Sequence, residues 1–139
     1  MSNGQCTHGK TANQMKYFNY YEFDSPDKPG SGHDMDPCFL EMLDDARTYA
    51  GIPFHVTSGF RTPEYNRELR KKGYKTSRQS AHLKGKAADI RCENNADRFL
   101  IISGAIQAGF TRIGIGKRFV HLDNCTAYDD KIEELIWIY

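Results

Sequence analysis

Two histidines and an aspartate are the residues of this sequence whose types and spacing best suit chemistry. His82 and Asp89 lie in the segment Ser80-Ala-His-Leu-Lys-Gly-Lys-Ala-Ala-Asp89, and His121 lies in Phe119-Val-His-Leu-Asp123. Zinc sites that catalyse hydrolysis use three ligands of this kind and leave the fourth position to water. The metal lowers the pKa of that water and polarises the carbonyl group under attack. The two segments therefore predict one hydrolytic zinc site.

The backbone around these residues can bring their side chains together. Gly85 lies between His82 and Asp89 and permits a turn that other residues resist. His121 and Asp123 are two residues apart in an expected strand, so their side chains point to the same face. A buried His–Asp hydrogen bond without a metal explains a single pair of this kind equally well. From the residues alone, the zinc site and the hydrogen-bonded pair both remain open.

A longer pattern resembles a known family. The pattern is Ser80-x-His82-x-x-Gly85-x-Ala87-x-Asp89, followed by His121 in a later strand and preceded by Ser58-Gly-Phe-Arg-Thr62. It resembles the zinc D-Ala-D-Ala carboxypeptidase-like metallopeptidase superfamily. This group includes VanX-type dipeptidases and phage L-Ala-D-Glu endolysins, and the hedgehog signalling domain has the same fold. The resemblance covers about residues 36–139 and is closest to the short, single-domain carboxypeptidase-like branch.

The resemblance implies a function and a set of ligands. By this likeness His82, Asp89 and His121 bind one Zn²⁺ ion. The protein is then expected to be a zinc-dependent peptidase that hydrolyses amide bonds involving D-amino acids in peptidoglycan stem peptides. A zinc-activated water is the expected nucleophile, as in a D-Ala-D-Ala carboxypeptidase or an endolysin.

One position departs from the family pattern. Endolysin and VanX-type members carry Glu or Asp three residues before the last histidine as the general base, and here that position holds Arg118. Asp123 is the candidate for moving the proton from the water to the leaving amine, because it shares a face with His121. Its alternative role is to orient His121, as carboxylates beside metal ligands commonly do. The departure also favours a second class of function, a zinc-containing module that binds the cell wall or a protein without turnover.

Two residues are candidates for substrate binding. Arg61 can grip a carboxylate with its two-pronged guanidinium, and in related enzymes an arginine from this segment contacts substrate. Its alternative is a structural salt bridge. Ser80 is suited either to hydrogen-bond the substrate or to hold the metal loop.

The expected secondary structure mixes helices and strands. Asp36 and Thr62 are suitable N-caps, and each precedes a proline at the first helical position. Strand runs follow each other at hairpin spacing, which favours an α+β domain with a largely antiparallel sheet and helices packed on one face. In the third helix we expect a core side of Phe99, Leu100, Ile102, Ile106 and Ala105. The expected helices cover 37–51, 63–73 and 95–108, and the expected strands cover 54–58, 87–92, 112–116, 119–123 and 135–139.

Composition narrows the class of protein. A chain of 139 residues with net charge +1 fits one domain and gives no electrostatic reason to expect nucleic acid as a partner. No apolar run approaches the about 20 residues of a membrane span. We expect an N-terminal segment, 1–35, which is polar, then aromatic-rich with a turn-rich loop, and a zinc peptidase domain, 36–139.

The N-terminus and the cysteines suggest where the protein is made. The first ten residues lack the apolar stretch of a signal peptide, so we expect synthesis in the cytoplasm. Action on the cell wall would then need a phage-type release. Free thiols are expected in that compartment for the four cysteines, which are Cys6, Cys38, Cys92 and Cys125.

Overall fold

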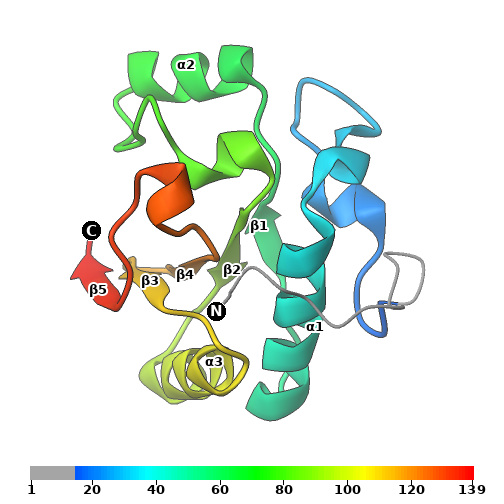
Figure 1. Ribbon diagram of the computed structural model, residues 1–139, viewed down its shortest axis with the longest axis vertical. Coiled ribbons are helices and arrows are strands. Elements are labelled where there is room, and N and C mark those ends of the chain that lie inside the picture. Colours follow the sequence, from blue (N-terminus) through cyan, green and yellow to red (C-terminus); the bar gives the residue numbers. More distant parts are fainter. Residues whose placement is uncertain (1–14) are drawn as a thin grey trace.

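The computed structural model describes residues 15–139 (Figure 1). A five-stranded sheet separates two long helices from a short one, and 3₁₀ turns join several of the elements. Within the described residues the helices are α1 (Pro37–Ala50), α2 (Pro63–Lys71) and α3 (Asn95–Gln107). The strands are β1 (Val56–Ser58), β2 (Ala87–Arg91), β3 (Arg112–Ile115), β4 (Phe119–Asp123) and β5 (Leu135–Ile138). The 3₁₀ turns are η2 (Tyr20–Phe23), η3 (Ser31–Asp34), η4 (Ala81–Lys84) and η5 (Ala127–Asp129).

The helices begin where their capping residues predict. The Asp36 carboxylate accepts a hydrogen bond from the Phe39 amide, and the Thr62 hydroxyl accepts one from the Tyr65 amide. Each cap satisfies a backbone donor that the first helical turn leaves without a partner. Helix α1 ends at Gly51, which adopts the left-handed conformation that glycine tolerates best.

The sheet has the strand order β1-β2-β4-β3-β5. All neighbouring strands are antiparallel except β3 and β5, which are parallel. The central pair β2 and β4 places Asp89 directly opposite His121. The α+β class and the largely antiparallel sheet are confirmed.

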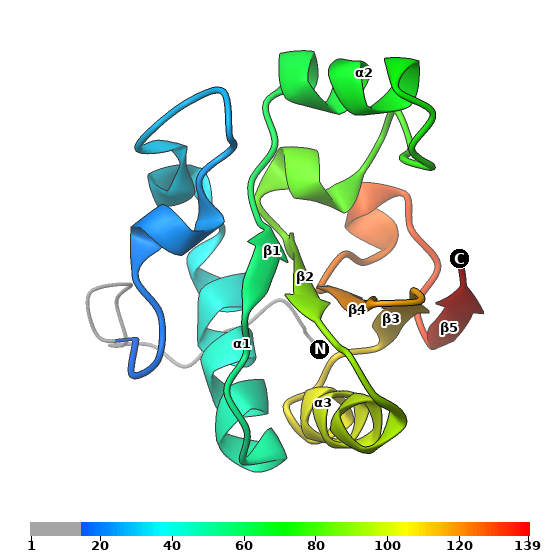
Figure 2. The same cartoon turned by 180° about the vertical axis from the view of Figure 1, so that it is seen from behind.

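One face of the sheet carries the hydrophobic core. Ile90 of β2 and Leu122 of β4 are fully buried, and they belong to the same cluster as Phe39 of α1 and Ile101 of α3. Helices α1 and α3 pack against each other over this face, whereas α2 lies at the opposite end of the molecule from α3 (Figures 1 and 2). Residues 15–35 join the core through Phe18, Phe23 and Met35.

The expected core side of the third helix is wrong in part. Ala105 is buried as expected, but Phe99 and Ile106 are 70% and 55% exposed, and Ile101 and Gly104 are buried in their place. The small residues lie against α1, where a side-chain carbon added at Gly104 would come within 2.5 Å of the Ala46 carbonyl oxygen. Close packing against α1 therefore decides which side of α3 is buried, and it favours small residues over large apolar side chains at the contact.

The cysteines are also only partly as expected. Cys38 is disulfide-bonded, so the prediction of a free thiol is wrong there. Cys92 and Cys125 are free and buried. Cys6 lies outside the described residues.

Within residues 15–139, none of the helices has the length and apolar character needed to cross a bilayer.

The core face predicts a contrast between two isoleucines in strands. Ile90→Ala removes a side chain that is 0% exposed and should lower the free energy of unfolding by about 2–5 kcal/mol. Ile138→Ala is the matched control, because Ile138 is 81% exposed and its loss should change stability by less than about 0.5 kcal/mol. Urea unfolding followed by circular dichroism measures both. Equal losses would contradict the placement of the core.

Candidate active site

Strand alternation puts two of the three expected ligands on the face opposite the core. Asp89 lies between Ala88 and Ile90, which point into the core, and His121 lies between Val120 and Leu122. The two ligands are therefore neighbours across the β2–β4 ladder with their side chains on the same side. This sheet face holds the site.

The third expected ligand comes from the turn before β2. The Ser80 hydroxyl accepts a hydrogen bond from the His82 amide and caps η4. Gly85 ends η4 in the left-handed conformation, at φ 69°. A side-chain carbon at Gly85 would lie 2.5 Å from the Asp34 carbonyl oxygen, so both conformation and space require glycine there.

The three side chains converge on one point. His82 Nε2 lies 3.4 Å from Asp89 Oδ1, and His121 Nδ1 lies 3.0 Å from the same oxygen. One ligand atom from each of the three residues lies within 4.8 Å of the others. Ligands about 2 Å from a tetrahedral ion are about 3.3 Å from one another, so this arrangement fits a single zinc-sized ion.

The other ring nitrogen of each histidine is held by the protein. His82 Nδ1 lies 2.7 Å from the Gly59 carbonyl oxygen, to which it donates, and this leaves Nε2 as a ligand. His121 Nε2 lies 2.7 Å from Asp123 Oδ2, which leaves Nδ1 as a ligand. Such partners fix the ring orientation and tautomer that metal binding needs. The residues therefore fit a metal ion in their chemistry as well as their spacing.

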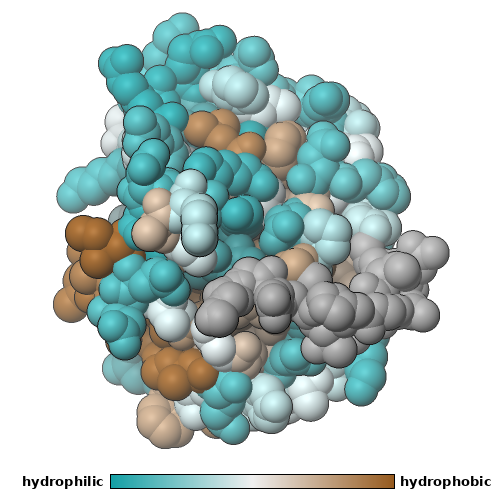
Figure 3. Space-filling model, viewed as in Figure 1, coloured by the Kyte–Doolittle hydropathy of each residue, from teal (hydrophilic) through white to brown (hydrophobic). Residues whose placement is uncertain are grey.

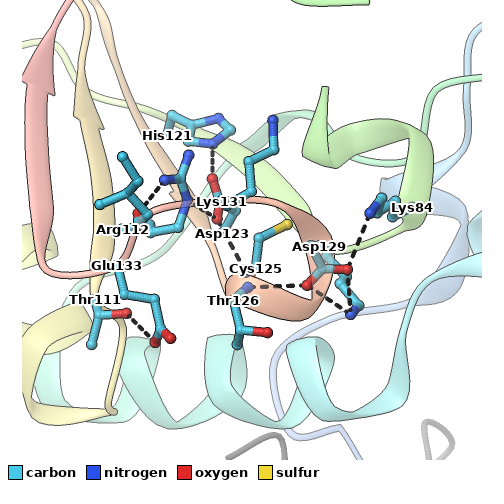
Figure 4. A network of polar contacts seen from close by, with 12 residues as sticks. Lys84, Thr111, Arg112, His121, Asp123, Cys125, Thr126, Asp129, Lys131 and Glu133 are labelled. Atoms are coloured by element: carbon cyan, nitrogen blue, oxygen red, sulfur yellow. Dashed lines mark hydrogen bonds and ion pairs between the residues drawn. The ribbon is translucent and has the colours of Figure 1, made fainter. Parts of the chain in front are cut away.

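Asp123 lies behind His121 in a buried network (Figure 4). Its Oδ1 accepts from Arg112 Nε at 2.7 Å and from the Cys125 amide at 3.1 Å. Asp123 is 1% exposed, so these donors compensate for the loss of water around its charge. The network fixes the position of the carboxylate that holds His121.

Arg61 supports the carboxylate of Asp89, the one carboxylate among the three expected ligands. Its Nη2 lies 3.5 Å from Asp89 Oδ2, and its Nε donates to the Ser58 hydroxyl at 3.0 Å. Its Nη1 donates to Thr76 and Asn66. The salt bridge considered as the alternative role of Arg61 is therefore present, and most of the guanidinium donors are already engaged.

The charges of the group shift its pKa values in opposite directions. Burial raises the pKa of Asp89, but His82 and His121 outweigh it and hold that pKa well below its usual range. Burial lowers the pKa of His121, but hydrogen bonds to Asp123 and Asp89 outweigh it and raise the value to about 9. Burial lowers the pKa of His82, against the opposing charge of Asp89. Without a metal, His121 is therefore the protonated histidine of the pair.

Two other residues considered from the sequence lie apart from the ligand group. Arg118 is exposed, and its carbonyl accepts from the Cys92 amide. The Cys125 thiol has its pKa raised to about 12 by burial and by the negative charges of Asp123 and Asp129. Within the described residues, the group that could hold a metal ion consists of His82, Asp89 and His121 and does not include Cys125.

A cavity of about 680 Å³ opens over the ligands. Arg61, Ser80 and Asp123 line it together with the three ligands, so all the expected site residues meet there. Sequence reasoning missed several other residues of its wall. The alternating pattern at 135–139 could have revealed two of these residues, Trp137 and Tyr139, because it places their rings on one face of the strand. The missed residues include Glu22, Tyr65, Tyr74, Lys75, Arg112, Phe119, Lys131, Trp137 and Tyr139.

Residues 16–123 match the family described as Peptidase M15. The chain belongs to the peptidase M15 family. The computed structure is also similar to the crystal structure of the Serratia marcescens L-Ala D-Glu endopeptidase ChiX, with a TM-score of 0.58. The two chains are 22% identical, and the match covers 70% of this chain and 85% of the Serratia chain. This second likeness concerns the fold. A search of curated proteins found no match.

The contact between Asp123 and His121 predicts a loss of metal affinity in this M15 member. Asp123→Asn should weaken zinc binding by about 10- to 100-fold, because the partner that orients the ligand histidine loses its charge. Competition with a chromophoric chelator measures the affinity. Asp130→Asn is the control, since Asp130 is exposed and lies at φ 59°, which asparagine tolerates. Equal affinities for the two variants would contradict the orienting role.

The shifted histidines predict how the metal-free protein responds to pH. The raised pKa of His121 contributes stability that is complete below pH 6.5 and is lost as pH rises to about 9. The lowered pKa of His82 has the opposite sign, because the unfolded chain gains a proton there below pH 6.5. Stability should therefore be greatest near pH 6.5. Urea midpoints between pH 5 and 9.5 measure it.

The control is the same series with His121→Gln. This variant should lose the decline on the alkaline side, because its side chain does not titrate. A decline of unchanged size in the variant would assign the effect to another group.

Proposed function

We propose that this protein is a zinc-dependent peptidase that hydrolyses amide bonds involving D-amino acids in peptidoglycan stem peptides. The observation that supports it best is the convergence of His82, Asp89 and His121 beneath an open cavity. M15 peptidases are zinc-dependent, and a neighbour in fold is described as an L-Ala D-Glu endopeptidase. An endopeptidase and a D-Ala-D-Ala carboxypeptidase cut different bonds, and the experiment below identifies which bond is cut.

A zinc ion held by His82, Asp89 and His121 would polarise the scissile carbonyl and supply an activated water. The protein's part is to hold the ligands in place. Asp123 fixes His121 from behind, and Arg61 holds the second oxygen of Asp89. Both carboxylates thereby stay charged and correctly oriented.

We propose that Arg61 contacts substrate through one donor at most. A guanidinium has five N–H donors. Four hydrogen bonds engage Ser58, Asn66, Thr76 and Asp89, so a two-pronged grip on a substrate carboxylate has no free pair of donors. Lys75 and Lys131 add positive charge to the cavity wall and are suited to attract that carboxylate.

Ser80 is also suited to two roles, one in the metal loop and one in substrate binding. Its hydroxyl caps η4 by accepting from the His82 amide, and the residue also lines the cavity. We assign it first to the metal loop, because the capping contact fixes the backbone of His82. A hydroxyl also carries a proton to donate, which can reach a substrate oxygen.

The proposal predicts restoration by metal. Treatment with a chelator should abolish cleavage of purified muropeptides, and added zinc should restore it, with mass spectrometry reporting the products and the bond. His121→Ala should stay inactive after zinc is added, because one of three ligands is gone. Cleavage at an undiminished rate by metal-free protein would rule the proposal out.

The same assay distinguishes the two roles of Asp123. If Asp123 only orients His121, saturating zinc should restore kcat of Asp123→Asn to near the unsubstituted value. If Asp123 is the general base, kcat should stay lower by about 10²-fold or more at saturating zinc. The three donors on this carboxylate favour the orienting role.

A zinc-containing binding module is the second candidate. The observation in its favour is Arg118, which stands where relatives carry an acid and lies on the exposed surface. Such a module should bind zinc and muropeptides without releasing any product. The mass spectra of the restoration experiment separate the two candidates directly.

A further inference from the structure

Three aromatic rings lie beside the three expected ligands, around the same cavity. Phe119, Trp137 and Tyr139, here called the aromatic wall, all line the cavity. The His121 ring lies 5.4 Å from Trp137 and 6.4 Å from Tyr139, measured between ring centroids. Phe119 and Tyr139 are 5.0 Å apart. The wall therefore stands directly beside one metal ligand.

Glycine on β3 makes room for this wall. Gly114 pairs with His121 on one side and with Trp137 on the other. A side-chain carbon at Gly114 would lie 2.7 Å from both Trp137 and Tyr139. Any other residue at this position would push the rings away from His121, so the sequence of β3 is suited to keeping them there.

The Tyr139 ring makes an edge contact with the His121 ring and lines the same cavity as the ligand group. Burial and the negative charge of Asp89 raise the pKa of Tyr139, while Trp137 and Arg61 oppose the rise. The phenol of Tyr139 carries an O–H group that can donate a hydrogen bond. The residue is 45% exposed, so a substrate in the cavity can reach it.

We propose that Tyr139 is a catalytic residue whose hydroxyl donates a hydrogen bond to the oxygen of the scissile carbonyl. The proposal rests on the proposed peptidase function. As water adds to the carbonyl carbon, negative charge develops on that oxygen, and a fixed donor in a partly dry site stabilises it. The C–N bond then breaks and the proton goes to the leaving amine. The phenol keeps its own proton throughout, so the step needs no further reactant.

The test is Tyr139→Phe, which keeps the ring of the aromatic wall and removes only the hydroxyl. We expect kcat on muropeptides to fall about 10²-fold or more, as for the loss of one oxyanion donor, with KM within about threefold. Zinc affinity should stay unchanged, because the three ligands and Asp123 remain. Tyr128→Phe is the control, since Tyr128 is 99% exposed, and its kcat should not change.

A second measurement separates catalysis from packing. A phosphinate dipeptide carries a tetrahedral, charged centre, so it should bind Tyr139→Phe at least tenfold more weakly than the unsubstituted protein. A plain peptide product should bind both proteins equally. If the wall only packs, neither the phosphinate affinity nor kcat will change, and the proposal falls.

The outcomes also separate this inference from the proposed function. If the zinc-loaded protein cuts muropeptides and Tyr139→Phe cuts them equally fast, only the role of Tyr139 is wrong. If the zinc-loaded protein itself releases no product, the peptidase function and the role of Tyr139 both fail.

Discussion

The contact on which the site depends most is the one between His121 and two buried carboxylates. Asp89 lies on one side of the imidazole at 3.0 Å and Asp123 on the other at 2.7 Å. Two negative charges so close together would repel one another without a cation between them. Arg61 and Arg112 each neutralise one carboxylate from the outer side. In the metal-free protein a proton on His121 serves the same purpose, and in the proposed zinc-bound state the metal ion would take its place.

This charge arrangement explains why the site is built on a sheet. Hydrogen-bonded strands hold Asp89 opposite His121, and Arg112 directly opposite Asp123, with little freedom. The alternate residues of the same strands form the core beneath α1 and α3. The apolar packing of one face therefore positions the ionic network of the other. Of the three proposed ligands, His82 alone comes from outside the ladder, and the carbonyl of Gly59 holds it.

Much of the fold and of the ligand group could be predicted from the sequence, because these features depend on the residues of short segments. The caps of α1 and α2 and the strand period that pairs His121 with Asp123 are properties of short segments. The three expected ligands do meet in space. Arg112 escaped prediction because its partner is set by strand register, which the sequence does not state. The core side of α3 differs in part from the prediction because its contact with α1 depends on the small size of Gly104.

The position of β5 at the sheet edge separates one wall of the cavity from the hydrophobic core. This strand pairs with β3 alone, and none of its residues belongs to the buried core clusters. Its apolar side chains Leu135, Ile136 and Ile138 are exposed, and the surface is hydrophobic at the left edge, where β5 lies (Figures 1 and 3). Trp137 of this strand lines the cavity, so substitutions at this edge can reshape one side of the cavity while the buried core remains intact. A change of selectivity at this edge would therefore cost little folding stability.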